Sequence, residues 1–158
     1  MLRFHRSTNP NHTMQQFLLL LLRHIADNLP ALSLVTEDCG QLETQEDTYP
    51  LTFPCVLAGN TDIDWQDLEE AGDNQRGTAT ITIRLAFDCY DDVHVGSTQE
   101  ASIAERYEFA EELHQLLQAL EFDETPDVWP LSRIKSRDYT LPGNIKVYES
   151  MYRFTVDG

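Results

Sequence analysis

The clearest pattern in the chain is an alternation of apolar and polar residues from position 78 to position 90. Six apolar residues occupy odd positions: Ala79, Ile81, Ile83, Leu85, Phe87 and Cys89. Thr78, Thr80, Thr82, Arg84 and Asp88 hold the even positions. A period of two is typical of a β-strand with one buried face. We therefore predict a strand over residues 78–90, with a turn at Gly77 before it.

A second segment has the period of a helix. Between positions 98 and 120 apolar side chains recur at spacings of three and four, and Ser97 followed by Glu100 has the form of a capping box. We predict an amphipathic helix over residues 98–120 that packs on a sheet and turns its glutamates to solvent.

The most hydrophobic run of the chain, residues 17–22, lies inside a predicted helix over residues 14–28. Thr13 is the expected N-cap, and Pro30 follows the end of the helix. Because the run is apolar on all sides, we expect the helix to be covered on more than one face, by the domain or by a neighbouring copy.

The remaining apolar segments are short and bounded by turn residues. We predict strands over residues 31–35 and 49–57, the second at a sheet edge because Pro54 cannot donate a ladder hydrogen bond. Residues 131–139 and 144–156 predict a hairpin closed by a Pro-Gly turn. The second and third predicted strands can pair antiparallel.

Two stretches, residues 37–49 and 61–72, are acidic enough to predict loops, the second with one short helical turn. In the last predicted strand the apolar parity changes between Val147 and Tyr152. Either a bulge near Glu149 or cover on both faces of the sheet explains that change.

The order helix, strand, strand, strand, helix, strand, strand predicts an α+β fold: a mixed or antiparallel sheet of about four to five strands with two main helices packed on it. The chain has 158 residues, of which 41% are apolar. We expect one domain over residues 14–158 after a flexible N-terminal arm, residues 1–13.

The formal net charge is −16, with 27 acidic and 11 basic residues. Binding to DNA or RNA requires Lys and Arg to displace counterions, so this balance argues against direct nucleic-acid contact. No Lys or Arg occurs between Arg23 and Arg76, whereas Arg133, Lys135 and Arg137 cluster near the C-terminus. An acidic side and a less acidic side suit head-to-tail contact between copies, although the acids can also serve solubility alone.

Five residues are candidates for an oligomer or partner interface. They are Arg133, Lys135 and Arg137 from the basic cluster, and Trp65 and Leu68 from the acidic interval. The pairing of a basic and an acidic segment would be sensitive to salt.

Chemistry-bearing motifs are absent from the sequence: it has no phosphate-binding loop and no familiar hydrolase signature. We expect no catalytic residues, no cofactor and no metal. Asp88, Asp91, Asp92 and His94 form the best polar group, but they lack the spacing of a calcium loop and are interpreted as a solvated loop. The three cysteines lack metal-ligand spacing and predict reduced thiols.

Targeting signals are also missing. Residues 17–22 are too short to cross a membrane, which takes about 20 apolar residues. The run is followed by Arg23, His24 and Asp27 rather than by a cleavage site. We therefore expect neither secretion nor membrane binding.

One succession of segments resembles a known family. It comprises a first helix ending near Asn28-Leu29-Pro30, residues 49–57 with Phe53-Pro54, a strand over 81–87, a helix over 107–120 and a closing strand over 147–156. This succession resembles the tail terminator, or tail completion, proteins of long-tailed phages and prophages. The very apolar first helix and the acidic interval 37–73 depart from the family.

The resemblance implies a small, non-enzymatic α+β protein that forms a ring, commonly a hexamer, on the end of the tail tube. Such a ring stops tube growth and offers the head a docking surface. The implied partners are tail-tube and head-connector proteins, and the implied place is the host cytoplasm during assembly and then the virion tail.

Two other classes remain open. An acidic inhibitor or DNA mimic would occupy a basic groove on a host protein, and it needs its acids on one ordered surface at phosphate-like spacing. A metal-dependent hydrolase using Asp88, Asp91 and Asp92 would require a bound cation.

Overall fold

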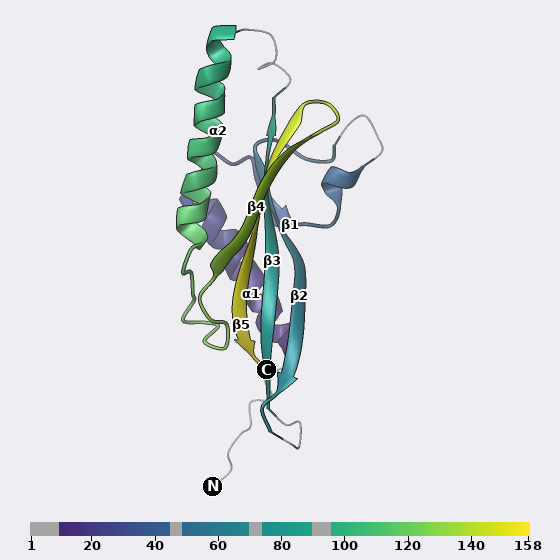
Figure 1. Cartoon of the computed structure of the whole chain (residues 1–158), viewed down its shortest axis with the longest axis vertical. Coiled ribbons are helices and arrows are strands. Elements are labelled where there is room, and N and C mark those ends of the chain that lie inside the picture. Colours follow the sequence, from purple (N-terminus) through teal and green to yellow (C-terminus); the bar gives the residue numbers. More distant parts are fainter. Residues whose placement is uncertain (1–9, 45–48, 70–73, 90–95) are drawn as a thin grey trace.

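The computed structural model describes residues 10–44, 49–69, 74–89 and 96–158. It confirms the α+β fold (Figure 1). The elements in chain order are α1 (Pro10–Asn28), β1 (Leu34–Glu37), the short 3-10 helix η1 (Gln41–Glu43), β2 (Cys55–Asp67), β3 (Gln75–Asp88), α2 (Gly96–Leu117), β4 (Ser132–Leu141) and β5 (Ile145–Asp157).

The strands form one five-stranded mixed sheet in the order β1-β2-β3-β5-β4. β1 runs parallel to β2, and every other neighbouring pair is antiparallel. The sheet is long and twisted, with α1 crossing behind it and α2 standing beside it in the view of Figure 1. The predicted antiparallel pairing around β3 is confirmed, with Cys55 opposite Ala86.

The main core lies between the two helices and one face of the sheet. β3 contributes the odd positions predicted from its alternation, and all of its core residues are at most 1% exposed. The residues that fill the centre of this core are Phe17, Leu21 and Ile25 of α1, Ala79, Ile81, Ile83 and Leu85 of β3, Leu113 and Leu117 of α2, and Tyr152 and Phe154 of β5. The periodicity of β3 therefore indicated its buried face correctly. For α2 it did so only in the second half, because Ile103 and Tyr107, which belong to the same apolar period, are 46% and 54% exposed.

A second, smaller core lies on the opposite face of the sheet, beneath η1 and the segment that precedes β2. Its buried members are Leu42, Cys55, Leu57, Ala86, Ile145 and Val147. Ile145 and Val147 thus face this second core, while Tyr152 faces the main one. β5 pairs with β3 without interruption, so cover on both faces explains the parity change and the suggested bulge at Glu149 is wrong. The bulge lies instead in β4, between Arg133 and Lys135.

The first helix begins earlier than its apolar pattern suggested. α1 starts at Pro10 rather than at Met14, so Thr13 is a buried residue inside the helix and not its N-cap. Proline is accepted in a first helical turn because the N–H that it lacks has no partner there. The helix is covered mainly on one face: Phe17 is fully buried, whereas Leu19 is 54% exposed.

The largest correction concerns β2. The strand predicted over residues 49–57 begins only at Cys55, after a cis Phe53–Pro54 peptide bond, and continues to Asp67 through a stretch predicted to be a loop. Its first residues lie between β1 and β3, so this part is not a sheet edge. In the second part Ile63 alternates with acids that point away from the main core, which lets a very acidic segment complete the ladder with β3.

Candidate protein-binding surface

The strand order leaves the sheet with two open edges. β4 forms one edge along its whole length. The other edge is formed by β1 and then by β2, because β1 covers β2 only from Cys55 to Ala58. Within the described ranges no strand pairs with the outer side of β2 from Asp62 to Asp67. Edge strands present unpaired backbone N–H and C=O groups, which are templates for pairing with another chain.

The β4 edge carries the predicted basic cluster. Arg133, Lys135 and Arg137 are all exposed. Arg137 donates from Nε to Oε2 of Glu149 at 2.6 Å, and this hydrogen bond raises the pKa of the Arg137 guanidinium. Lys135 and Arg133 have no carboxylate within ion-pair distance among the residues that the structure describes. Their charges are therefore available to a partner.

The β1–β2 edge carries acids and two exposed apolar side chains. Glu37, Asp62 and Asp64 are exposed, and none of them forms an ion pair with a cation of the described chain. Trp65 is 37% and Leu68 51% exposed. The Trp65 ring lies over a residue without a side chain: a Cβ on Gly77 would stand 3.1 Å from Cε3 of the ring and 2.6 Å from Cγ2 of Ile63.

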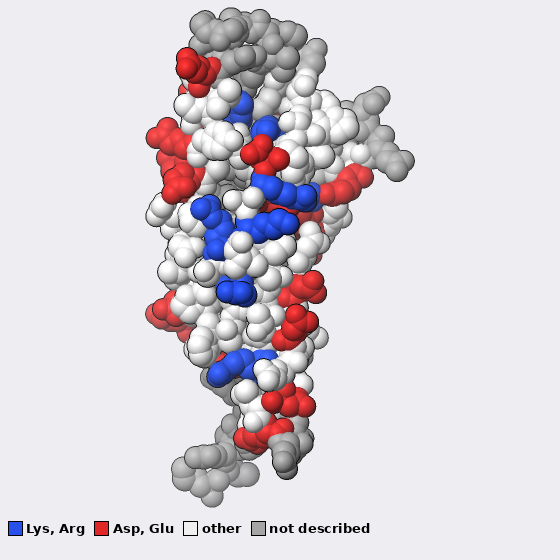
Figure 2. Space-filling view, viewed as in Figure 1, with Lys and Arg blue, Asp and Glu red and all other residues white. Residues whose placement is uncertain are grey.

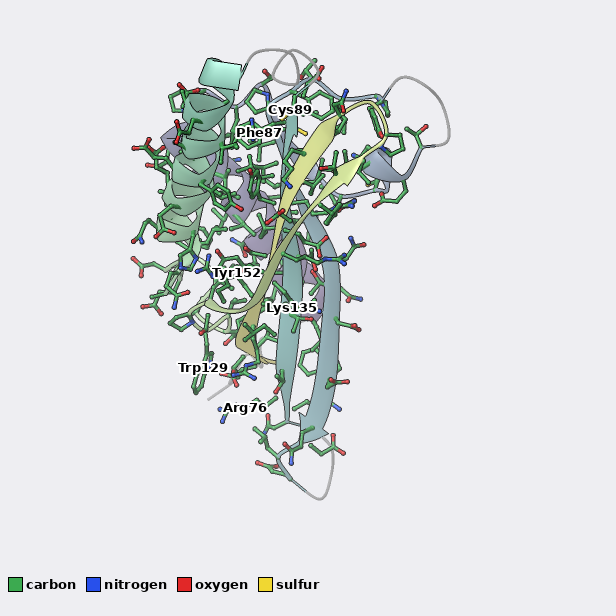
Figure 3. The ribbon with its side chains drawn as sticks, turned by 45° about the horizontal axis from the view of Figure 1, so that its top comes forward. Arg76, Phe87, Cys89, Trp129, Lys135 and Tyr152 are labelled. Carbon is green, nitrogen blue, oxygen red and sulfur yellow. The ribbon has the colours of Figure 1, made fainter. Side chains whose placement is uncertain are left out.

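The five predicted interface residues thus divide between the two edges and form no single patch. The three basic residues lie on β4, and Trp65 and Leu68 lie on and just beyond β2. Figure 3 shows Lys135 above Trp129 and Arg76 in that view. Two separate surfaces of opposite charge are what a contact between unlike surfaces of identical copies requires.

Cations also collect on the sheet face opposite the helices. Lys135 and Arg137 lie on this face because they pair with Met151 and Glu149, which stand opposite Thr82 and Arg84 of β3. Figure 2 shows Lys and Arg gathered along the middle of this view, with most Asp and Glu along the two margins. The acids therefore do not form one continuous surface on this side of the molecule.

One basic residue at the end of this face is already used inside the chain. Arg76 pairs with Asp157 at 2.9 Å, and its guanidinium lies 4.9 Å from the centre of the Trp129 ring. Nε1 of Trp129 also donates to Asp157, at 3.0 Å. The positive charge of Arg76 is therefore already paired within the chain.

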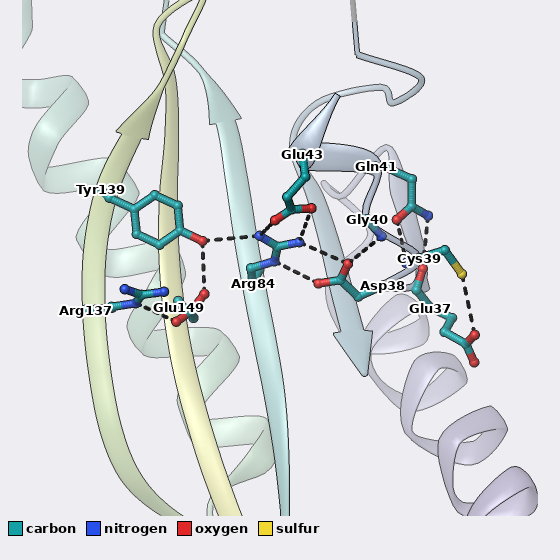
Figure 4. A network of polar contacts seen from close by, with 10 residues as sticks. All are labelled: Glu37, Asp38, Cys39, Gly40, Gln41, Glu43, Arg84, Arg137, Tyr139 and Glu149. Carbon is teal, nitrogen blue, oxygen red and sulfur yellow. Dashed lines mark hydrogen bonds and ion pairs between the residues drawn. The ribbon is translucent and has the colours of Figure 1, made fainter. Parts of the chain in front are cut away.

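Arg84 is the exception among the cations, because it is buried (Figure 4). Its Nε and Nη2 donate to the two carboxylate oxygens of Asp38 at 2.8 and 3.0 Å, and Nη2 donates to Oε2 of Glu43 at 3.0 Å. Burial alone would lower the pKa of Arg84, but the hydrogen bonds to Glu43 and Asp38 raise it above its ordinary value. The group fastens η1 and the end of β1 to the sheet.

Arg84 also links this cluster to the β4 side. Its Nη1 donates to the Tyr139 hydroxyl at 3.4 Å, and that hydroxyl donates to Oε1 of Glu149 at 2.9 Å. A shallow hollow of about 530 Å³ opens beside Arg84 and Arg137. The charged side chains that line it are bound to one another, so the hollow presents a mixed polar surface and has no evident nucleophile or base.

A metal site, a reactive thiol and a membrane-spanning helix each require particular features of the described residues. Within ranges 10–44, 49–69, 74–89 and 96–158, no three His, Cys, Asp or Glu side chains are placed to hold a metal ion. Asp88 ends β3, whereas Asp91, Asp92 and His94 lie outside the described residues. The cysteines are free thiols. Burial raises the pKa of Cys55 to about 11, which leaves it protonated and unreactive. Among the described helices, none combines the length and the apolar composition that a bilayer-spanning segment needs.

Sequence reasoning missed the strand that carries part of the acidic surface, and it missed the burial of Arg84. Asp62 and Asp64 were assigned to a loop, although their alternation with Ile63 and Trp65 was a period-two signal. The buried role of Arg84 had no local signal, since its partner Asp38 lies on a distant segment.

Comparison with known proteins adds one likeness. No family model matches the chain, and no curated protein matches it. Among solved structures, the chain is similar to a chain in the virion of a native gene transfer agent (GTA) particle, with 13% sequence identity and a TM-score of 0.47, over 92% of this chain and 92% of that one. The identity and the TM-score are both too low for this likeness to bear on function.

Proposed function

We propose that this chain is a non-enzymatic assembly protein of a phage or prophage tail, a terminator that forms a ring on the tail tube and joins it to the head. The resemblance in element order supports this role. The observation that carries the proposal is that one sheet ends in two open edges of opposite charge, on β4 and on β1–β2.

A closed ring needs two different, complementary surfaces on every subunit. The two edges meet that requirement, because Arg133 and Lys135 of β4 and the acids of β1–β2, none of which forms an ion pair within the described chain, lie at opposite edges of one sheet. Both helices share the main core with the sheet, which supports a single domain over residues 14–158. Trp65 and Leu68 give the acidic edge an apolar end suited to protein contact.

The distribution of acids favours this role over that of a DNA mimic. A mimic presents one ordered acidic surface, whereas here a band of Lys and Arg separates the acids of α2 from those of β2 in the view of Figure 2. A basic groove on a host protein would meet this band as well as the acids, and like charges repel there.

Electron microscopy of the protein mixed with its cognate tail tubes tests the proposal. We expect caps at one end of the tubes, and tubes of defined length when they assemble in the presence of the protein. Tubes assembled without it give the reference distribution of lengths. Absence of tube binding, together with tight one-to-one binding to a DNA-processing host protein, would overturn the terminator role in favour of the mimic.

A further inference from the structure

We infer that the β4 edge of one copy docks against the β1–β2 edge of the next, with Arg133 beside Glu37 on the helix side and Lys135 beside Asp62 on the open side. This inference deepens the proposed ring function, and the closing of the ring rests on that function. The contact between two copies can be measured without tail tubes. We call Arg133, Lys135 and Arg137 the basic edge, and Glu37, Asp62 and Asp64 the acidic edge.

The register of the sheet fixes the level of each charge, by which we mean its position along the strand direction. One row of paired residues crosses the sheet from one edge to the other: Ser136, Ser150, Ile83, Ala58 and Glu37. A second row joins Ser132, Arg153, Thr80 and Asp62. Arg133 and Lys135 lie between these two rows, and Arg137 lies one residue beyond the first. The basic edge thus spans the same levels as Glu37 and Asp62 on the opposite side.

Copies related by rotation about an axis along the strands keep these levels. In such an arrangement Arg133 of one copy and Glu37 of the next both face the helix side, two residues apart along the strands, and Lys135 and Asp62 both face the open side at the same separation. No shift along the axis is needed to bring the unlike charges together. A ring closes only if the contact introduces no such shift, since a shift generates a helix instead.

Strand direction also suits the contact. β3 is antiparallel to β2, β5 to β3 and β4 to β5, so β4 runs antiparallel to both β1 and β2. The next copy would therefore add its β1–β2 edge in the antiparallel sense already used by most of this sheet. From Lys135 to Leu141 β4 pairs regularly with β5, which gives the neighbour a regular edge beyond the bulge.

The charges select unlike edges over like ones. Two β4 edges would bring six cations of the basic edges together, and two β1–β2 edges would bring acids together. Like charges placed opposite each other in an interface are strongly unfavourable, so symmetric dimers through either edge are disfavoured. What remains is the head-to-tail pairing of a basic with an acidic edge, weakened by salt.

Charge reversal tests the choice of edges. The variant Arg133→Glu/Lys135→Glu has two acidic edges, and the variant Glu37→Lys/Asp62→Lys has two basic ones. We expect the unchanged protein to self-associate at low salt in sedimentation velocity, and we expect each variant alone to lose that association. A mixture of the two variants should associate again, and so should a chain that carries all four changes. Reversals that leave association unchanged would overturn the inference.

Disulfide trapping tests the level and detects even a weak contact between monomers. In a Cys39→Ser background, Ser136→Cys with Glu37→Cys places thiols at the two ends of one row. Oxidation at high protein concentration should give a ladder of covalent oligomers. In the matched control pair, Ser136→Cys with Asp67→Cys, the two residues lie several rows apart along the strands. This pair should give no ladder. Equal yields from both pairs, or none from the first, would refute the proposed register.

The outcomes separate this inference from the proposed function. Tubes that are capped equally well by the reversed variants would leave the terminator role intact and remove the edge contact. A ladder together with charge-dependent association, but without capping of tubes, would keep the contact and remove the terminator role.

Discussion

Replacing Arg84 by methionine would leave Asp38 buried with no counter-charge. The two side chains are 7% and 1% exposed and meet through a pair of hydrogen bonds of 2.8 and 3.0 Å. Glu43, the second carboxylate of the group, is 58% exposed and can turn to water. The cost of the substitution therefore falls mainly on Asp38.

Removing one partner of a buried ion pair typically costs about 3–5 kcal/mol, because the remaining charge stays desolvated. For a chain of this size each kcal/mol lowers the melting temperature by roughly 2–4 °C, so Arg84→Met should lower it by roughly 6–20 °C. The matched control is Arg76→Met on the same strand and the same sheet face. Its ion pair with Asp157 is well exposed, and its loss should cost at most about 1 kcal/mol.

Calorimetric or circular-dichroism melts of the two single variants and of Arg84→Met/Asp38→Asn provide the assay. Asparagine keeps an acceptor for the backbone N–H of Gly40, which Asp38 now binds at 3.1 Å, and it removes the stranded charge. The double variant should therefore melt above Arg84→Met alone. If Arg84→Met loses no more stability than Arg76→Met, or if the double variant is the least stable, the buried charge does not determine the cost.

The other expectations concern the core, cations and pH. Ile83→Asp and Leu113→Asp should each abolish cooperative melting, because an unpaired charge in the main core costs several kcal/mol out of about 5–15 kcal/mol of total stability. The control Leu19→Asp, on the exposed side of α1, should melt near the temperature of the unchanged protein. Millimolar calcium, magnesium or manganese should leave the melting temperature unchanged, and a saturable rise that Asp91→Asn removes would reveal a metal site. Burial lowers the pKa of His114 in the folded state, so the unfolded state takes up a proton first as the pH falls, and the free energy of unfolding should drop below roughly pH 6.5. His114→Gln should flatten urea-derived stability between about pH 7.5 and 5.5, and parallel curves for the two proteins would refute that origin.

The elements that could be predicted are those with a strong local period. β3 has apolar residues at its odd positions, so it was found with its main buried face. α2 repeats at three and four, so it was found as a helix, but Ile103 and Tyr107 of the same period are exposed and only its second half is buried as predicted. The sequence prediction ended β2 too early, because the second half of this strand has acids on its solvent side and only Ile63 and Trp65 on the other side. Acidic composition favours a loop, and the ladder with β3 overrode that local preference.

The environment of Arg84 could not be predicted, because it depends on a fold that covers both sheet faces. Alternation alone turns Arg84 to solvent, as it does Thr80 and Thr82. η1 and the end of β1 then cover the upper part of that face and bring Asp38 onto the guanidinium. Burial on the second face was set by a segment that carries no strong period of its own.

The basic edge shows how topology changes the meaning of a local cluster. Arg133, Lys135 and Arg137 share one parity, so a regular strand would put all three on one face of the sheet. The bulge between Arg133 and Lys135 separates them: Arg133 pairs with Tyr152 on the helix side, whereas Lys135 and Arg137 lie on the open side. The three charges therefore share an edge and not a face. A partner that lies flat on either face meets only part of the cluster, while a partner that docks along β4 meets all of it, and the acidic edge of a second copy carries its charges at the same levels.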